Sequence, residues 1–223
     1  PSANGSLILA AGQDLLTAYT GQLGNSSIGL NSLEMADAST SGGVTLYNEL
    51  GAPTPATLSS PIHANDPNPV VIYAGQDIIG KFRLIKDAQV EAGRDILDTQ
   101  FIGQNNSAND VTSIIAGRDI LSTNVIDGTV YPLTSFGVAN ASQTPAGASL
   151  LELYGPGQFE IAAGRNLGPF LVHPYSDING GIFALGDGGN FTPLQFAPNG
   201  PALGVVSYLP VQGANITALF GVG

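Results

Sequence analysis

An acidic or amide side chain recurs at one position of a repeated pentapeptide. The pattern Ala-Gly-(Arg/Gln)-(Asp/Asn)-(Ile/Leu) occurs five times, and its fourth position holds Asp14, Asp77, Asp95, Asp119 and Asn166. Such acids could form a calcium ladder, because Ca²⁺ prefers carboxylate oxygens. Calcium-binding solenoids, however, use a denser Gly-Gly-x-Gly-x-Asp repeat, which is absent here. We therefore predict no metal site, and expect these side chains to bond turn amides or to pair with Arg94 and Arg118.

Paired carboxylates of a polysaccharide-cleaving enzyme are a second possibility. The candidates are Glu91, Glu152 and Glu160 on predicted strand faces and Asp98 and Asp110 in predicted loops. Glycoside hydrolysis requires two carboxyl groups about 5 to 9.5 Å apart. The chain has no Trp to line sugar subsites, and its 6 Lys and Arg leave few bases for lyase chemistry. We therefore predict that the protein is not an enzyme and has no catalytic residue and no cofactor, with a polysaccharide-active enzyme as the least favoured alternative.

The remaining reactive side chains are few. His63 and His173 each lie near prolines in predicted loops, where isolated histidines are more often surface residues than a catalytic or metal-binding pair. The sequence has no Gly-x-Ser-x-Gly motif, and it has no cysteine for a disulfide, a thiolate metal site or a nucleophile. The sequence also has six Asn-x-Ser/Thr sequons. Any glycan is expected at the three loop sequons, Asn25, Asn105 and Asn140, rather than at Asn4, Asn190 or Asn215.

Composition narrows the class of protein. The 17 acidic and 6 basic residues give a net charge of −11, which leaves no basic stripe for a nucleic-acid backbone. The 30 Gly and 15 Pro predict frequent turns, and the 43 % apolar content predicts an ordered core. No apolar run approaches the roughly 20 residues of a membrane span. The first residues lack a signal-peptide pattern, so we expect a processed chain or an internal fragment that is soluble.

The pentapeptides predict the fold. Their glycines, Gly12, Gly75, Gly93, Gly117 and Gly164, are separated by 63, 18, 24 and 47 residues, which we interpret as 3, 1, 1 and 2 units of about 20 residues. Each copy follows an alternating apolar segment such as Val70-Ile72-Ala74, which predicts a strand with one wet face. The glycine is expected to take φ > 0 where the chain turns. Repeated strand, corner and strand predict a parallel β-solenoid with on the order of ten coils.

Two regions interrupt this pattern. Five prolines within 51–69 predict a loop that leaves one coil, and further prolines and Gly-Gly pairs follow residue 168. We therefore expect a shaft over 1–168 and, over 169–223, its continuation or end with long loops. Residues 30–38 are expected to form a strand and turn or a single helical turn. The loops 51–69 and 170–210 are expected to provide contact surface, and four aromatic residues there serve either as contacts or as core: Tyr175, Phe183, Phe191 and Phe196.

The five pentapeptides resemble the recurrent turn of filamentous-haemagglutinin-like exoproteins, which Gram-negative bacteria export by two-partner secretion. The segments 151–167 and 213–223 resemble longer blocks of the same family. The resemblance implies a right-handed parallel β-helix that is exported through an outer-membrane β-barrel transporter. It further implies an adhesin, secreted or held at the cell surface, that attaches to host-cell, bacterial or glycan surfaces. The NPN-type motifs of the family's secretion domain are not found, since Asp66-Pro67-Asn68-Pro69 fits an ordinary turn, and this favours an internal or C-terminal segment.

A second hypothesis is a subunit of a self-assembling extracellular filament or sheath. The open end of a β-helix exposes unpaired backbone groups, which favour end-to-end self-association. Neither end of this sequence carries the pattern of an amphipathic capping helix. Light scattering or negative-stain imaging would separate a short rod from filaments.

Overall fold

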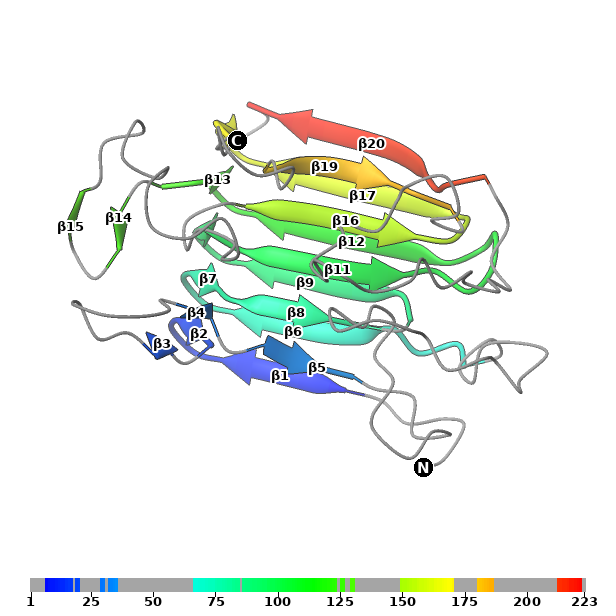
Figure 1. The fold of residues 1–223 in the computed structure, drawn as a ribbon, viewed down its shortest axis with the longest axis horizontal. Helices are drawn as coiled ribbons and strands as arrows, with labels where there is room; N and C mark the ends of the chain where they lie inside the picture. The colour runs from blue at the N-terminus through cyan, green and yellow to red at the C-terminus, as the bar shows by residue number, and fades with distance from the viewer. Residues whose placement is uncertain are drawn as a thin grey trace, which may run out of the picture.

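The chain folds into stacked β-strands. The computed structural model describes residues 7–17, 19–20, 29–30, 32–35, 66–84, 86–123, 125–126, 129–130, 149–170, 180–186 and 212–221. Within these residues all regular structure is β-strand, and three parallel sheets account for most of it (Figure 1). The predicted all-β class with stacked parallel strands is confirmed, and the arrangement is compatible with a β-solenoid.

Each sheet collects one strand from each successive layer of the chain. Sheet 1 has the order β1 (Ile8–Ala11), β6 (Val70–Ala74), β9 (Ala88–Ala92), β12 (Val111–Ala116), β17 (Gln158–Ala163) and β20 (Asn215–Phe220). Sheet 2 contains β2 (Leu15–Leu16), β7 (Ile78–Ile79), β10 (Asp95–Leu97), β13 (Asp119–Leu121) and β18 (Asn166–Leu167). Sheet 3 contains β5 (Ser32–Glu34), β8 (Lys81–Arg83), β11 (Gln100–Gln104), β16 (Leu150–Tyr154) and β19 (Gly181–Ala184). The chain visits sheets 1, 2 and 3 in this order in each of five layers, and β20 begins a sixth.

The predicted number of units between the pentapeptides was wrong. β1 pairs directly with β6, and β12 pairs directly with β17, so the intervals of 63 and 47 residues each correspond to one layer. The additional residues lie in connections between sheets. Two of these connections contain short antiparallel hairpins, β3 (Tyr19–Thr20) with β4 (Gly29–Leu30) and β14 (Val125–Ile126) with β15 (Thr129–Val130). Sheet 1 therefore holds six strands within the described residues, where the sequence suggested about ten coils.

The core consists of identical or similar side chains that stack from layer to layer. Alternation along each strand of sheet 1 directs one set of side chains inward, and parallel register then places like residues above one another. The inward ladders are Ile72, Val90, Ile114 and Ile161; Ala74, Ala92, Ala116 and Ala163; and Ile78, Ile96 and Ile120. All of these side chains are buried. Burial of each of the larger ones contributes about 1.5–3 kcal/mol.

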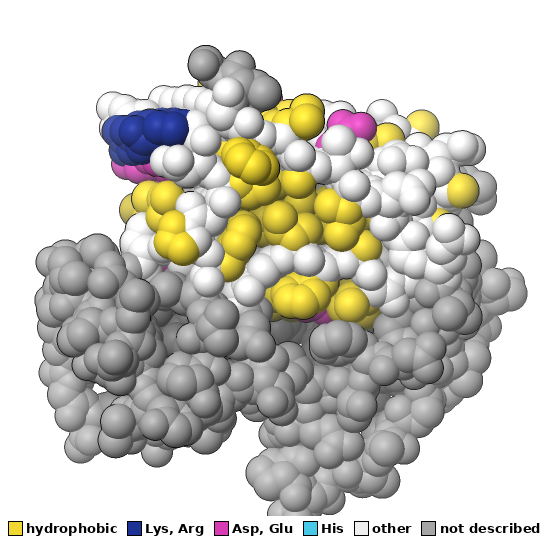
Figure 2. Space-filling view, turned by 90° about the horizontal axis from the view of Figure 1, so that it is seen from above, with side chains coloured by type: hydrophobic (Ala, Val, Ile, Leu, Met, Phe, Trp, Pro, Cys, Tyr) yellow, Lys and Arg dark blue, Asp and Glu magenta, His cyan; other side chains and the backbone are white. Residues whose placement is uncertain are grey.

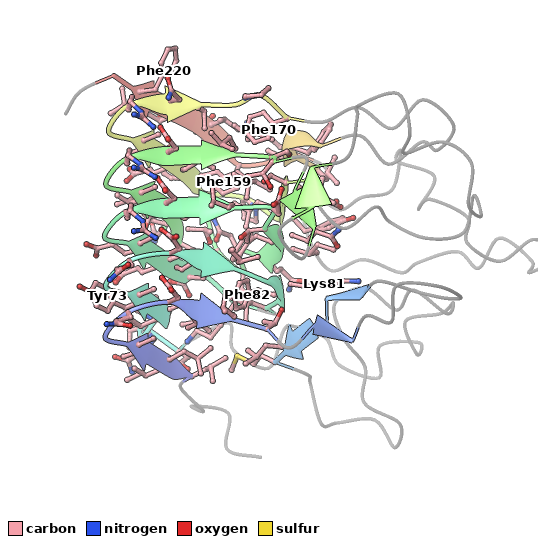
Figure 3. All side chains as sticks on the ribbon, turned by 90° about the vertical axis from the view of Figure 1, so that its left-hand side faces the viewer. Tyr73, Lys81, Phe82, Phe159, Phe170 and Phe220 are labelled. Atoms are coloured by element: carbon pink, nitrogen blue, oxygen red, sulfur yellow. The ribbon has the colours of Figure 1, made fainter. Side chains whose placement is uncertain are left out.

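Aromatic residues fill the space between sheets 1 and 3. Figure 3 shows Phe82 and Phe159 directed into the interior, whereas Tyr73 points outward. The rings of Phe101 and Phe159 stack with their centroids 6.5 Å apart. In the region 30–38, which was expected to form a strand and turn or a helical turn, Leu30 ends β4, Ser32–Glu34 form β5, and Met35 is described but lies outside the strands. The part of the predicted loop 51–69 that precedes Asp66 lies outside the described residues.

Candidate functional site

The five pentapeptides lie above one another at the corner between sheets 1 and 2. From the second layer on, the amide of the pentapeptide glycine donates to the carbonyl of the pentapeptide alanine in the layer below. Examples are Gly93 to Ala74 at 2.8 Å and Gly117 to Ala92 at 2.9 Å. The following residues also bond between layers, since the amide of Arg118 donates to the Arg94 carbonyl at 2.7 Å. The corner is thus an uninterrupted backbone ladder.

The reason given for glycine at this corner was wrong. None of the five pentapeptide glycines has a positive φ. Among the described residues, the glycines with a positive φ are Gly155, Gly157, Gly168, Gly186 and Gly221. Glycine is required because the layers approach closely. A Cβ on Gly75, Gly93, Gly117 or Gly164 would lie 2.2 to 2.3 Å from the carbonyl oxygen of the glycine below. A Cβ on Gly12, in the first layer, would meet nothing within 4 Å.

The carboxylates of the corner form ion pairs between layers. Arg94 binds Asp77, Arg118 binds Asp95, and Arg165 binds Asp119 through Nε and a terminal nitrogen, with Nε to Oδ1 distances of 2.7, 2.8 and 2.9 Å. The same Oδ1 atoms accept the backbone amides of Asp95, Asp119 and Asn166 in the next layer, at 3.1 to 3.2 Å. Viewed down the stack, basic side chains gather at one corner beside acidic ones (Figure 2).

Within the described residues, the two ends of this ladder, Asp14 and Asn166, have no arginine partner. In the second layer Gln76 occupies the arginine position, and Asp14 accepts the amide of Asp77 at 3.1 Å. At the other end Asn166 replaces aspartate, and its Nδ2 donates to Asp119 at 2.9 Å. The substitution of an amide for a carboxylate there gives Asp119 a further donor. The repeated position thus bonds to the layers above and below it.

Electrostatics at the corner favour the charged forms of both partners. Hydrogen bonds from Arg94 and Arg165 hold the pKa of Asp77 and that of Asp119 below the ordinary value of 3.8. Their carboxylates in turn raise the pKa of each of these arginines. Among the described residues there is no group of three His, Cys, Asp or Glu side chains able to hold a metal ion. The geometry of the corner is that of a structural ladder.

The carboxylates considered for glycoside hydrolysis are dispersed. Glu91 and Glu160 both point outward from sheet 1, but β12 separates their strands and they are offset by two residues along the strands. Strand spacing and rise then place their Cα atoms about 12 Å apart. Glu152 lies on sheet 3, where it accepts a hydrogen bond from the Tyr154 hydroxyl. The structure does not bring these three side chains together.

The two loop acids are bonded within the stack. Asp110 accepts the amides of Asn106 and Ser107, at 2.7 and 2.9 Å, and the Ser107 hydroxyl at 2.8 Å. Asp98 is buried and has a positive φ of 48° between sheets 2 and 3, where it accepts the amide of Thr123 at 2.6 Å and its hydroxyl. Each acid therefore stabilises a connection.

Burial of two carboxyl groups predicts a characteristic pH dependence. Burial raises the pKa of Asp98 to about 7, and burial with the negative charge of Asp110 raises the pKa of Asp87 to about 6, against an ordinary value of 3.8. Groups with a raised folded-state pKa contribute stability that is present below the unfolded pKa and is lost as the pH rises through the folded value. We therefore expect Asp87 and Asp98 to reduce the free energy of unfolding as the pH rises from about 4 to about 7.

The acids with lowered pKa act in the opposite direction but at lower pH. Asp77 and Asp119 contribute stability above the unfolded value of 3.8 that is lost as the pH falls through their lowered pKa values.

Urea unfolding of Asp98→Asn tests the role of Asp98. Between about pH 5 and about pH 8, the free energy of unfolding should decline less for this variant than for the unchanged chain. Asparagine tolerates the positive φ, which makes the variant conservative. An equal decline in both proteins would contradict the assignment to Asp98.

The sequon at Asn105 is not a glycan site in this fold. Its side chain has no exposed surface, and Nδ2 donates to three backbone carbonyls, those of Asp110, Pro156 and Gln158, at 3.2, 2.8 and 3.2 Å. Its Oδ1 accepts the Thr112 hydroxyl at 2.7 Å. The choice of Asn105 as one of the favoured positions for any glycan was therefore wrong. Of the other sequons, Asn215 begins the exposed strand β20, and Asn4, Asn25, Asn140 and Asn190 lie outside the described residues.

Sequence reasoning missed two polar clusters at the connections from sheet 3 to sheet 1. One is the Asn105 network, and the other is a buried pair formed by Lys86 and Asp66. Neither belongs to a repeated motif, so the sequence carries no signal for them. His63 and His173 lie outside the described residues, as do most positions of the predicted contact loop 170–210. Of the four aromatic residues there, Phe183 is described and belongs to β19 in sheet 3, half-buried.

No family model, curated protein or solved structure matches the chain. In the part of the chain that the structure describes, no helix has the length and hydropathy that a membrane crossing requires.

Proposed function

We propose that this chain is a right-handed parallel β-helix that forms a rigid, non-catalytic shaft segment of a secreted bacterial surface protein and mediates attachment or aggregation. The observation that carries the proposal is the in-register stacking of the five pentapeptides at one corner, with ladders of buried Ile, Val and Ala behind them. A stack in which each layer bonds to its neighbours is typical of solenoids, and solenoids serve as extended scaffolds with lateral binding surfaces.

The lengths of the connections support separate roles for the corners. The turn from sheet 1 to sheet 2 spans two or three residues in all five layers, as in 93–94 and 117–118. The other two corners vary widely: β13 and β16 are separated by 122–149, whereas β10 and β11 are separated by 98–99. Long insertions at fixed corners leave the stack intact while providing variable surface. Attachment to a host-cell, bacterial or glycan surface is therefore assigned to these two corners.

The family resemblance extends this proposal to export and location. Similarity of the pentapeptides to filamentous-haemagglutinin-like exoproteins favours two-partner secretion through an outer-membrane β-barrel transporter of a Gram-negative bacterium. A fold built from layers that bond successively suits folding as the chain emerges, because each new layer pairs with one already formed. A neighbouring gene for such a transporter would support this assignment.

A filament or sheath subunit is the second candidate. The observation that favours it is the exposure of apolar residues on the two outermost strands of sheet 1, with Ile8 67 % and Phe220 62 % exposed. Figure 2 shows apolar side chains in the centre of the surface seen from above. Outermost strands of a sheet present unpaired backbone groups that can pair with another chain.

One set of measurements separates these functions. Beads coated with the full chain should attach to bacterial or animal cells more than albumin-coated beads do, and free chain should compete. Light scattering and negative-stain imaging of the same sample should show a monodisperse rod. Filaments would favour the assembly candidate, and release of reducing ends from polysaccharides would favour an enzyme. A monodisperse chain that neither attaches to cells nor releases sugar ends would overturn the adhesive function.

A further inference from the structure

An aspartate and a lysine from two successive connections between sheet 3 and sheet 1 are buried against each other. The side chains of Lys86 and Asp66 are each 1 % exposed, and Nζ lies 2.7 Å from Oδ2. Lys86 Nζ also donates to the backbone carbonyl of Asn68, which holds the amine in place. Asp66 accepts the amide of Asn68 at 3.1 Å, which fixes its carboxyl group.

This pair differs from the ion pairs of the corner. The arginines there are 44 to 59 % exposed, and their charges remain solvated. Lysine is seldom fully buried, because its compact ammonium group is strongly hydrated. A buried ion pair contributes little net stability, because desolvation of both ions opposes their attraction. A covalent bond between the two groups would remove both charges and their desolvation cost.

We propose that Lys86 and Asp66 form an intramolecular amide cross-link. The neutral amine of Lys86 attacks the side-chain carboxyl carbon of Asp66, a C–N bond forms, a C–O bond breaks, and one water molecule leaves. Starting from the ion pair, the lysine ammonium group loses two protons. The carboxylate takes up the first, and the leaving oxygen takes up the second, so that this oxygen departs as water. No oxidant, reductant or cofactor is required.

The protonation state needed for attack is available within the pair. The hydrogen bond from Lys86 holds the pKa of Asp66 below its ordinary value, so the resting state is the ion pair. Transfer of one proton from Nζ to the carboxylate gives the neutral pair without any exchange with solvent. Fixed contact between the reacting groups replaces a bimolecular encounter with an effective molarity of about 10⁵ M or more.

The cross-link would tie the start of the second layer to the start of the third, so that tension along the chain between them would be carried by a covalent bond.

The intact mass of the purified full chain tests the proposal. We expect a species lighter than the sequence mass by one water, and a tryptic digest of the unfolded chain in which a peptide with Asp66 is joined to one with Lys86. The variants Lys86→Arg, which keeps the positive charge, and Asp66→Ala should both have their full sequence masses. The full sequence mass in the unchanged chain, with ordinary cleavage after Lys86, would overturn the proposal.

A second source of water loss requires its own control. Asp127-Gly128 and Asp187-Gly188 are dipeptides in which an aspartate can dehydrate to a cyclic imide. A missing water that persists in Lys86→Arg would come from such a site and would overturn the cross-link. The result is independent of cell attachment, so failure of this proposal leaves the proposed function intact, and the reverse also holds.

Discussion

Gly117→Ala is expected to lower the free energy of unfolding by about 3 kcal/mol or more, whereas Gly12→Ala should leave it unchanged or raise it by up to about 1 kcal/mol. A Cβ on Gly117 would lie 2.3 Å from the Gly93 carbonyl oxygen. That atom belongs to the backbone, so the contact is relieved only by separating the layers. Separation would weaken the hydrogen bond from the Gly117 amide to the Ala92 carbonyl.

Gly12 provides the matched control because it occupies the same position of the same motif. It has no neighbour within 4 Å of an added Cβ, and its φ is not positive. Alanine there removes conformational freedom from the unfolded chain without a clash in the folded one. Urea unfolding followed by circular dichroism measures both variants. Equal losses at Gly12 and Gly117 would show that close stacking is not the reason for glycine.

The pentapeptides were sufficient to predict the sheet class and the location of one corner. The alternation of apolar residues before each glycine predicted the inward ladders, because period two and parallel stacking both act on neighbouring residues. The reason for glycine could not be read in the same way. A positive φ is a property of one residue, whereas the contact between Gly117 and Gly93 depends on how closely two layers approach.

The number of layers was misjudged for a related reason. Equal unit lengths were assumed, but insertions between Leu121 and Leu150 add residues without adding a strand to sheet 1. The entropic cost of closing a loop rises only slowly with its length, so the stacked sheets accept such insertions in the connections between them. Strand pairing is long-range information, which the intervals between glycines do not contain.

The roles of the acids were also only partly predictable. Pairing with Arg94 and Arg118 was expected because a column of stacked carboxylates would repel itself. The structure adds the direction of pairing: each arginine binds the aspartate of the layer below, and that carboxylate also accepts an amide of the arginine's own layer. Correct register of one layer on the next is therefore favoured by charge as well as by apolar packing.

Asn105→Asp is expected to lower the free energy of unfolding by about 3–5 kcal/mol near neutral pH. The amide group of Asn105 donates to three carbonyl oxygens, and a carboxylate at the same position would face those oxygens as a buried negative charge. The Asn105 carbonyl oxygen also lies 1.9 Å from where a Cβ on Gly155 would be, so the neighbouring backbone has little room to withdraw. Protonation restores one donor, and the loss should therefore diminish as the pH falls.

Asn109→Asp is the control, because Asn109 is exposed in the same turn. The same chemical change at Asn109 should alter the free energy of unfolding by no more than about 0.5 kcal/mol. Urea unfolding of both variants at about pH 7 and about pH 4 separates the buried charge from a general effect of added negative charge. If Asn105→Asp is as stable as Asn109→Asp at both values, the amide does not bind the three carbonyls. The network matters because it joins the third, fourth and fifth layers at the corner between sheets 3 and 1. Its loss should therefore weaken the stack at the end of sheet 1 opposite the ion-pair ladder.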